Sequence, residues 1–440
     1  MDVKKKKLGF KLILFSMLLL PGLQVLFIIG CNSDYLIRFP FYILISVLSF
    51  LTLVGLIYGI KIFIKNRGAN KRRLRKWIKI VLSVFMSIYI LGCVTLVTLL
   101  YGPNDRFRTW LITTAMQTMN HQYFCKWFYN QDTINSIMNN NYVLESGEST
   151  DTSLVNKKSS KWRKEEYANE YEKEILDVDD DTKYKIIEFE INGVNGHLAA
   201  IYDPSMVKLA VTKYLGVRGQ YVTAMAGDHD AILAINGGGF YDPGNSSAGG
   251  TPNGITISDG KIITNGQYGT NTQGGGIIGF TNDDILVLLK YTSAQEAINM
   301  GVRDAITWGP FLIVNGEPSF IKGNGGWGYA ARSAIGQRED GIVLLLVIDS
   351  NAVRTKGADM VDLTEIMQNY GAINAANLDG GTSSVMVMPK KIAQKEYNAS
   401  CNDYFTDTHC AINDPIDGEL YHRTRPIADA WIVVEEDTEE

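Results

Sequence analysis

The sequence predicts an α+β protein in which three N-terminal transmembrane helices are followed by a β-rich α+β domain. The first hundred residues contain three long apolar runs, and the intervening loops are short and polar. From about residue 184, short apolar runs alternate with Gly, Asn and Asp, which is typical of strands and tight turns. We therefore expect a membrane anchor over 1–103, a stalk and linker over 104–183, and a folded domain over 184–437.

The three apolar runs lie at about 8–30, 41–64 and 77–100. Each can cross a bilayer, because ~20 helical residues span a hydrocarbon core about 30 Å thick. Lys11 and the Pro21-Gly22 pair in the first run are compatible with this, since lysine can snorkel and membrane helices accept Pro and Gly. A lipid bilayer is therefore an expected partner of this chain.

Basic residues predict the orientation of these spans. Lys4 to Lys7 precede the first span and a basic loop at 65–76 follows the second, whereas the loop between the first two spans carries only Arg38. The positive-inside rule then predicts a cytoplasmic N-terminus and an extracellular chain after Tyr101, in a multi-pass protein of the cell membrane. Ile28 to Cys31 also resembles a lipoprotein cleavage site, and that alternative leaves the folded domain outside as well.

The polar stretch after the spans has two parts. Residues 104–140 carry several large apolar side chains but are too polar for a fourth span, so we expect an interfacial or stalk helix against the membrane surface. Residues 141–183 are rich in Ser, Glu, Lys and Asp, which is typical of a linker.

The folded domain is expected to consist mainly of short strands. Asp259-Gly260 and Asn315-Gly316 predict hairpin turns, because these pairs accept the positive φ that such turns need. A helix is expected over 362–370, with Asp362 and Glu365 as its N-terminal cap and Gly371 at its end, and further helices are expected over 217–227 and 293–300. The predicted strands are 185–191, 197–202, 231–235, 254–258, 261–264, 285–290, 311–314, 342–348, 384–388 and 428–434.

Charge and cysteine content narrow the function classes. The net charge of −5 gives no basic excess, so no nucleic-acid partner is expected. Cys401 and Cys410 are the only cysteine pair in the folded domain, and an oxidising compartment would let them form a disulfide. Two free thiols are the alternative.

Four clusters of glycine or polar residues flank apolar strands of the domain. Loops at strand ends present chemistry on a rigid scaffold, and glycine-rich turns let backbone N–H groups approach an anion. Neither glycine cluster is a Walker loop or a G-x-S-x-G elbow, and any one of them alone would be explained by a tight turn. The clusters are NGGGFY (236–241), ARSAIG (331–336), NLDGGTSS (377–384) and RTRP (423–426).

Asp379 is the leading candidate for acid–base or nucleophilic work, because it lies between an apolar strand and a Gly-Gly turn. Arg332 and Arg425 are suited to bidentate phosphate binding. Asp349 follows the most apolar strand and is a second candidate carboxylate, although capping the next loop would explain it equally well. The histidines lack companions at metal-ligand spacing, so no metal and no cofactor are expected.

Taken together, the four clusters resemble the phosphodiester glycosidase family over about residues 184–437. That family includes the lysosomal enzyme that removes N-acetylglucosamine from a phosphodiester, and bacterial proteins linked to exopolysaccharide biosynthesis. The chain departs from the family pattern where Thr382-Ser383 follows the Gly-Gly pair, since Gly-Ser is common there. The resemblance and the clusters together predict a substrate-binding set of Asn236, Gly237, Gly238, Arg332, Ser333, Gly380, Gly381, Thr382, Ser383 and Arg425.

The resemblance implies a cell-surface hydrolase that cleaves a sugar-1-phosphodiester, like that of N-acetylglucosamine, in an envelope glycan or exopolysaccharide. Asp379, Asp349 and Arg332 are the expected catalytic residues. A non-catalytic module that binds anionic glycan in a cell-wall or exopolysaccharide assembly complex would use the same arginines. A metal-dependent phosphodiesterase is a third alternative, for which the sequence offers too few clustered ligands.

Overall fold

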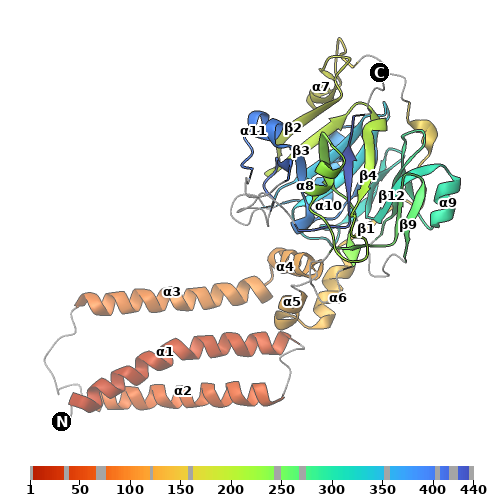
Figure 1. The fold of residues 1–440 in the computed structure, drawn as a ribbon. Coiled ribbons are helices and arrows are strands. Elements are labelled where there is room, and N and C mark those ends of the chain that lie inside the picture. Colours follow the sequence, from red (N-terminus) through yellow and green to blue (C-terminus); the bar gives the residue numbers. More distant parts are fainter. Residues whose placement is uncertain are drawn as a thin grey trace. The chain divides into compact units, whose positions relative to one another are not determined.

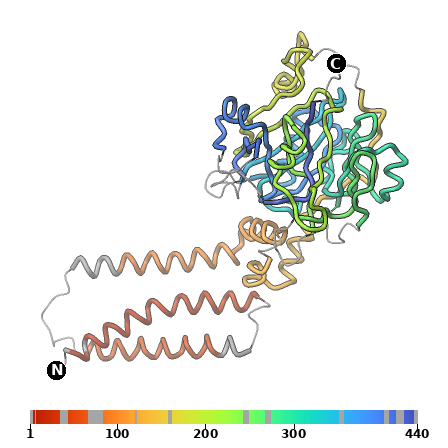
Figure 2. Tube along the Cα trace, viewed as in Figure 1, coloured from red at the N-terminus to blue at the C-terminus, as the bar shows by residue number. Residues whose placement is uncertain are grey.

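The computed structural model forms two compact units, Met1–Asn139 and Asn140–Glu440, and each is considered by itself. Chain order runs from red to blue in Figures 1 and 2. The structure describes residues 3–33, 39–65, 76–118, 122–156, 162–241, 249–266, 274–350, 357–401, 407–415 and 425–435. Most of the basic loop at 65–76, which predicts the orientation, lies outside these residues.

The first unit contains three long helices, α1 (Val3–Asn32), α2 (Phe39–Lys65) and α3 (Lys76–Tyr101). All three are long and apolar enough to cross a membrane, which confirms the predicted spans. α1 packs against α2 where Gly9 and Gly59 meet, since a Cβ on Gly9 would lie 2.8 Å from the Gly59 carbonyl oxygen. Small residues allow such close approach of membrane helices.

Residues 104–140 form three short helices rather than one stalk helix: α4 (Arg106–Met116), α5 (Gln122–Phe128) and α6 (Gln131–Asn139). They surround a small core that also includes the end of α3. Leu111 and Phe128, two side chains that suggested a membrane-facing helix, pack against this core instead. Its buried members are Leu100, Ile112, Ala115, Cys125, Tyr129 and Ile134.

The expected linker at 141–183 belongs largely to the folded unit, so the predicted domain boundary at 184 is about forty residues too late. β1 (Tyr142–Leu144) pairs with β15 (Phe320–Lys322). α7 (Glu170–Leu176) and Trp162 add buried apolar side chains to a core of the second unit. Those few apolar side chains in a polar sequence supply enough buried surface to hold the segment on the domain.

The folded unit is built from antiparallel sheets. Its largest sheet has seven strands in the order β14-β13-β18-β16-β17-β3-β2. These strands are β2 (Tyr184–Ile191), β3 (Val194–Ile201), β13 (Phe311–Val314), β14 (Glu317–Pro318), β16 (Arg332–Arg338), β17 (Val343–Ile348) and β18 (Ala372–Asn377).

Two five-stranded sheets complete the framework, in the orders β20-β19-β5-β21-β4 and β11-β10-β12-β8-β9. The first contains β4 (Val207–Val211), β5 (Leu233–Asn236), β19 (Met386–Pro389), β20 (His409–Ala411) and β21 (Asp429–Val433). The second contains β8 (Ile255–Ser258), β9 (Lys261–Asn265), β10 (Gly276–Thr281), β11 (Leu286–Leu289) and β12 (Val302–Trp308). A short pair joins β6 (Phe240–Tyr241) to β7 (Thr251–Pro252).

The main core lies where the inner faces of these three sheets meet, around Trp431, Phe280 and Leu345. Helices cover the outer faces. α10 (Met360–Asn369) and α7 cover the seven-stranded sheet, α8 (Val222–Asp228) covers the first five-stranded sheet, and α9 (Ala294–Asn299) covers the second. Sheets stacked face to face with helices on the outside confirm the predicted α+β class.

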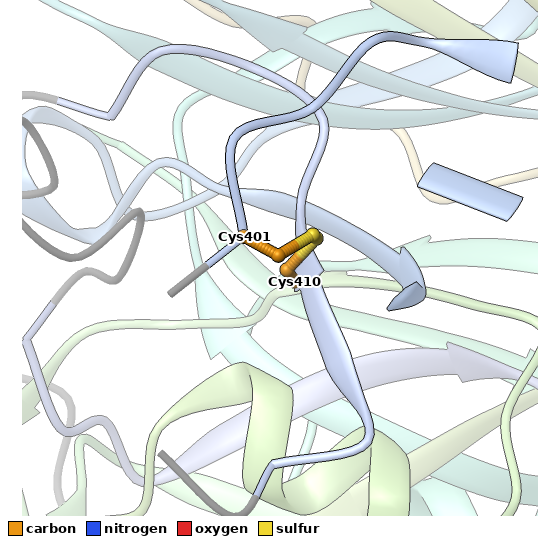
Figure 3. The surroundings of a disulfide bond; sticks show 2 residues. All are labelled: Cys401 and Cys410. Atoms are coloured by element: carbon orange, nitrogen blue, oxygen red, sulfur yellow. A yellow bond between two sulfur atoms is a disulfide. The ribbon is translucent and has the colours of Figure 1, made fainter. Parts of the chain in front are cut away.

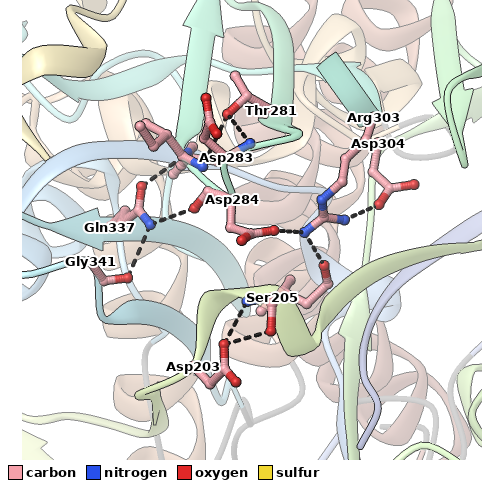
Figure 4. Close-up of polar contacts among 12 residues, drawn as sticks. Asp203, Ser205, Thr281, Asp283, Asp284, Arg303, Asp304, Gln337 and Gly341 are labelled. Atoms are coloured by element: carbon pink, nitrogen blue, oxygen red, sulfur yellow. Dashed lines mark hydrogen bonds and ion pairs between the residues drawn. The ribbon is translucent and has the colours of Figure 1, made fainter. Parts of the chain in front are cut away.

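A buried polar network fastens the second five-stranded sheet to the seven-stranded one (Figure 4). Arg303 forms ion pairs with Asp304 and Asp284, and it donates to the Val207 carbonyl at 2.8 Å. Gln337 donates to the carbonyls of Asp284 and Gly341, both at 3.0 Å. Because these groups bond to partners on these two sheets and to Val207 of β4 in the first five-stranded sheet, we assign this network to packing of the sheets.

Local predictions from turn and cap residues hold, with one correction. Both hairpins have positive φ at the expected pairs, for example 51° at Asp259 and 68° at Gly260. The cap of α10 is formed by Asp359 and Asp362, not by Asp362 and Glu365, because the helix begins at Met360. The predicted disulfide joins Cys401 to Cys410 and ties the chain after α11 (Lys390–Glu396) to β20 (Figure 3).

Candidate active site

Three of the four sequence clusters meet at one edge of the sheets. The loop after β5 is bonded to the loop after β18, because the Asp379 N–H donates to the Gly237 carbonyl at 3.1 Å. The start of β16 holds the same loop, since the Leu378 N–H donates to the Ser333 carbonyl at 2.8 Å. The fourth cluster reaches this place through Arg425, whose charge acts on the Asp379 carboxylate.

Asn236 fastens these loops together. Its side chain is fully buried, its Nδ2 donates to the Asp379 carbonyl at 2.7 Å, and its Oδ1 accepts from the Ser333 hydroxyl at 2.6 Å. The same oxygen accepts from the Val385 N–H at 3.2 Å. Asn236 and Ser333 were expected to bind substrate, and the structure turns both side chains toward the protein, where they position Asp379.

Asp379 is partly buried and surrounded by groups that stabilise its charge. Burial raises the pKa of its carboxyl group, because a charged carboxylate loses hydration there. The Ser383 hydroxyl, the Gly380 N–H and the positive charges of Arg425 and Arg332 oppose this rise. The charges of two guanidinium groups therefore favour the ionised form of this carboxyl group.

Arg332 is buried, and the backbone holds its guanidinium group in place. Its Nε donates to the Ala358 carbonyl at 3.1 Å, and one terminal nitrogen, Nη2, donates to the carbonyls of Trp327 and Gly328 at 2.6 and 2.8 Å. Burial lowers the pKa of Arg332 to about 10, so it stays protonated at neutral pH. Among the described residues, the other terminal nitrogen, Nη1, has no hydrogen-bond acceptor, and it lies beside Gly380.

The remaining substrate-binding candidates surround Asp379. The Arg425 guanidinium stacks over the Phe240 ring at 4.7 Å from its centroid. Gly381 to Ser383 form one turn of 3-10 helix, in which Thr382 is partly exposed and Ser383 is buried. The Gly381 N–H donates to the Ala331 carbonyl at 2.8 Å, which ties this turn to the strand that carries Arg332.

Asp429 completes the site, and sequence reasoning missed it. Its side chain is 1% exposed, and its Oδ1 accepts from the Gly238 N–H at 2.7 Å. Burial, followed by repulsion from Asp379, raises the pKa of Asp429 to about 7. Gly237 must be glycine here, because a Cβ would lie 2.2 Å from the Asp429 carboxylate. A lone carboxyl inside the apolar run IADAWIVV was the available signal.

Asp349 lies in a different polar cluster. Its Oδ1 accepts from Asn413 Nδ2 at 2.9 Å and from the Asp414 N–H at 3.1 Å. Burial raises the pKa of Asp349 and lowers that of His197, while the charge of each opposes the shift of the other. Since Arg332 faces Ile348 and His197 faces Val347, alternation places Asp349 on the opposite face of the sheet from Arg332.

The described residues contain no group of three or more His, Cys, Asp or Glu side chains that could hold a metal ion. The site instead combines two carboxyl groups, two guanidinium groups and a glycine-rich turn. This combination can hold an anion and can move a proton, which defines a class of site suited to hydrolysis of an anionic substrate.

Comparison with known proteins shows which family the folded domain resembles. Residues 229–434 match the family model described as phosphodiester glycosidase, and this range includes Asn236, Arg332, Asp379 and Arg425. This match supports the resemblance to the phosphodiester glycosidase family that the sequence clusters predict.

Individual relatives are distant. The chain is 27% identical over 168 residues to the SPbeta prophage-derived uncharacterized protein YomE of Bacillus subtilis (strain 168). The aligned residues are 37% of this chain. The match spans 25% of that protein, so this chain aligns with only about a quarter of the relative's length.

Solved structures that match part of this chain include the zebrafish N-acetylglucosamine-1-phosphodiester alpha-N-acetylglucosaminidase catalytic domain, auto-inhibited by its pro-peptide. It has a TM-score of 0.42 and 21% identity, covering 57% of this chain and 82% of that one. A putative exported protein from Burkholderia pseudomallei has a TM-score of 0.36 and 16% identity, covering 55% and 74%. A hypothetical protein from Synechocystis has a TM-score of 0.35 and 16% identity, covering 57% and 61%.

Proposed function

We propose that this protein is a membrane-anchored hydrolase that cleaves a sugar-1-phosphodiester, of the N-acetylglucosamine type, in a glycan of the cell envelope. The observation that carries the proposal is the position of Arg332 Nη1 beside Gly380, next to Asp379, whose carboxylate is stabilised by the charges of Arg425 and Arg332. The match of residues 229–434 to the phosphodiester glycosidase family supports this substrate class. The basic residues beside the apolar spans support an extracellular position for the domain.

Arg332 is suited to holding the phosphate. Its backbone contacts fix the guanidinium plane before substrate arrives, and Nη1 remains for a phosphate oxygen. Arg425 supplies a second positive charge near Asp379. Two cations would neutralise the phosphodiester and make the departing phosphate a better leaving group.

Asp379 supplies the carboxylate. The bond that breaks joins the anomeric carbon to the phosphate oxygen, so positive charge develops at that carbon in the transition state. Asp379 would stabilise that charge or accept a proton from the attacking water. Asp429 would act through Asp379, because it is buried behind the same loop and its ionisation adds negative charge to the site.

The test uses the full chain in detergent micelles and a sugar-1-phosphodiester of N-acetylglucosamine, with release of free sugar as the readout. Asp379→Asn keeps the shape of the side chain and removes its charge, so kcat should fall by on the order of 10²-fold or more. Arg332→Ala should also raise KM, because it removes a phosphate contact. Asp283→Asn, at an exposed turn of the same domain, is the control and should keep wild-type activity.

Two results would contradict the proposal. If Asp379→Asn is folded and fully active, the carboxylate is misassigned, and Asp429→Asn, at the other carboxyl group of the site, becomes the variant to measure. If the wild type binds sugar phosphodiesters but releases no sugar, the domain is a glycan-binding module instead. Loss of activity with a chelator would show that a metal takes part.

A further inference from the structure

The three short helices after the last span are bonded to the ends of two membrane helices. The Ser33 hydroxyl, just past the end of α1, donates to the Lys126 carbonyl of α5 at 2.7 Å. The Tyr101 hydroxyl at the end of α3 donates to the Phe128 carbonyl at 2.9 Å, and the Tyr129 hydroxyl donates to the Leu100 carbonyl at 3.2 Å. α5 is therefore held at the level where α1 and α3 end, as Figure 2 shows for these segments.

That level corresponds to one surface of the membrane. α1 and α3 are separated by one return helix, so both run in the same direction across a bilayer and end at the same face. A short helix tied to both ends must lie near the boundary between lipid headgroups and acyl chains. This conclusion holds whichever side of the membrane that face is on.

α5 has two distinct faces. Cys125 is fully buried and Phe128 packs against the small core, so this side faces the protein. Tyr123, Phe124 and Trp127 point away from the core and are 50%, 39% and 44% exposed. The Tyr123 and Trp127 rings contact each other with centroids 5.1 Å apart. Three large aromatic side chains thus share the outer face of a helix that has only seven residues.

The chemistry of this face fits a lipid surface. Trp and Tyr concentrate where the membrane meets water, because their rings are apolar and their N–H and O–H groups are polar. Trp110 on the neighbouring α4 is also exposed, at 41%. The three basic residues of α4 to α6, Arg106, Arg108 and Lys126, outnumber the two acidic residues at Asp105 and Asp132, which favours anionic headgroups.

We propose that the aromatic face of α5, formed by Tyr123, Phe124 and Trp127, inserts into the headgroup region of the bilayer face at which α1 and α3 end. An amphipathic helix in this position buries its apolar side chains ~5–10 Å into the boundary between headgroups and acyl chains. The helix group α4–α6 then fixes the depth of the spans without adding a fourth crossing.

The test reconstitutes the full chain in vesicles of phosphatidylcholine with about one-quarter phosphatidylglycerol, since anionic lipid should aid binding. The acyl chains are brominated either near the headgroup or near the chain end, because bromine quenches nearby tryptophan. Subtracting the emission of Trp127→Phe from that of the wild type isolates Trp127. We expect bromine near the headgroup to quench this component about 2-fold more strongly than bromine near the chain end, as the shallow depth requires.

Tyr291→Trp is the matched control, because Tyr291 is a fully exposed aromatic residue of the folded unit. The added emission should be quenched by aqueous acrylamide and not by brominated lipid. The proposal is wrong if the Trp127 component behaves like this control, since the face would then lie in water. It is also wrong if neither quencher reaches Trp127, which would mean that the folded unit or a second copy covers the face.

Discussion

At the scale of single residues, the site depends on two carboxyl groups that share one loop. The Gly238 N–H donates to Asp429, whereas the Gly237 carbonyl accepts from the Asp379 N–H. Cations lie near Asp379, and Asp429 has a single backbone donor in place of a counter-charge. When two carboxyl groups interact, the one with better stabilisation loses its proton first. We therefore assign the negative charge to Asp379, and we expect Asp429 to keep its proton until the pH rises through its pKa of about 7.

This assignment predicts how stability depends on pH. A carboxyl group whose pKa is raised in the folded state stabilises the fold below its unfolded pKa, and that contribution is lost as pH rises through the folded pKa. For Asp429 this pH range extends from its pKa of ~3.9 in the unfolded chain to its pKa of about 7 in the folded protein. Asn does not ionise, so Asp429→Asn removes this loss of folding stability. Each unit of pKa shift corresponds to roughly 1.4 kcal/mol of stability.

Thermal unfolding of residues 140–440 between pH 4 and 8 measures the effect. The melting temperature of the Asp429→Asn variant should rise relative to wild type as pH increases, and Asp283→Asn should follow the wild-type curve. The same variant should also bind a phosphodiester better than wild type above pH 7, because wild-type Asp429 then adds a repelling charge. Parallel curves for Asp429→Asn and wild type would show that Asp429 does not titrate in this window.

At the scale of elements, the segment between the helical anchor and β2 locks the sheets together. The Glu145 side chain is 2% exposed, pairs with Lys290 at 2.6 Å and accepts from the backbone N–H groups of Gly275 and Phe311. The Asp151 N–H donates to the Asn315 side chain at 2.7 Å, at the hairpin turn after β13. A segment with a polar composition therefore belongs to the fold through a buried ion pair and a few specific bonds.

Glu145→Gln tests this role. The amide still accepts a hydrogen bond but leaves Lys290 without its counter-charge in a largely buried place. Removal of one partner of a buried pair typically costs 3–5 kcal/mol, so we expect the free energy of unfolding to fall by about 3 kcal/mol. Urea unfolding of residues 140–440 is the measurement, and Glu148→Gln, on the exposed part of the same segment, is the control. Equal stability of the two variants would mean that the pair contributes little.

Strands differ in how well their sequence reveals them. The apolar run of β17 was predicted, because Leu, Ile and Val fill its buried faces. β16 and β18 were missed, although they lie beside each other in the interior of the same sheet. The sequences of β16 and β18, RSAIGQR and AINAAN, consist largely of small and polar residues. These residues are buried because neighbouring strands cover them, not because their side chains are apolar. Sequence patterns register side-chain hydrophobicity, so they miss strands of this kind.

The same distinction applies to the site. Asp379 and Arg332 are candidates from the sequence because they stand next to glycine turns and small residues that depart from the local pattern. Asp429 was missed because its importance depends on a loop almost two hundred residues earlier in the chain. The bonds of Asn236 to Ser333 and to the Asp379 carbonyl depend equally on tertiary structure.

At the scale of the whole molecule, the chain combines a helical unit that can cross a membrane with a separate hydrolase-like unit. The Cys401–Cys410 disulfide in the folded unit fits an oxidising compartment. Three spans put the two ends of the anchor on opposite sides, and the basic residues at 65–76 favour the cytoplasm for the loop between the second and third spans. The folded unit can reach the proposed substrate, an envelope glycan, only if it lies on the outer side of the membrane.

Cysteine labelling of intact cells tests this orientation. In a chain whose free cysteines Cys31, Cys93 and Cys125 are replaced by Ser, a single new cysteine is placed at Ser149 or at Asn70. Ser149 is exposed on the folded unit, so a maleimide that cannot cross membranes should label Ser149→Cys in intact cells. Asn70→Cys, in the basic loop, should react only after the cells are made permeable. Equal labelling of both variants in permeable cells is the control for reactivity. The reverse pattern would place the folded unit in the cytoplasm, where a disulfide is rarely retained and an envelope glycan is out of reach.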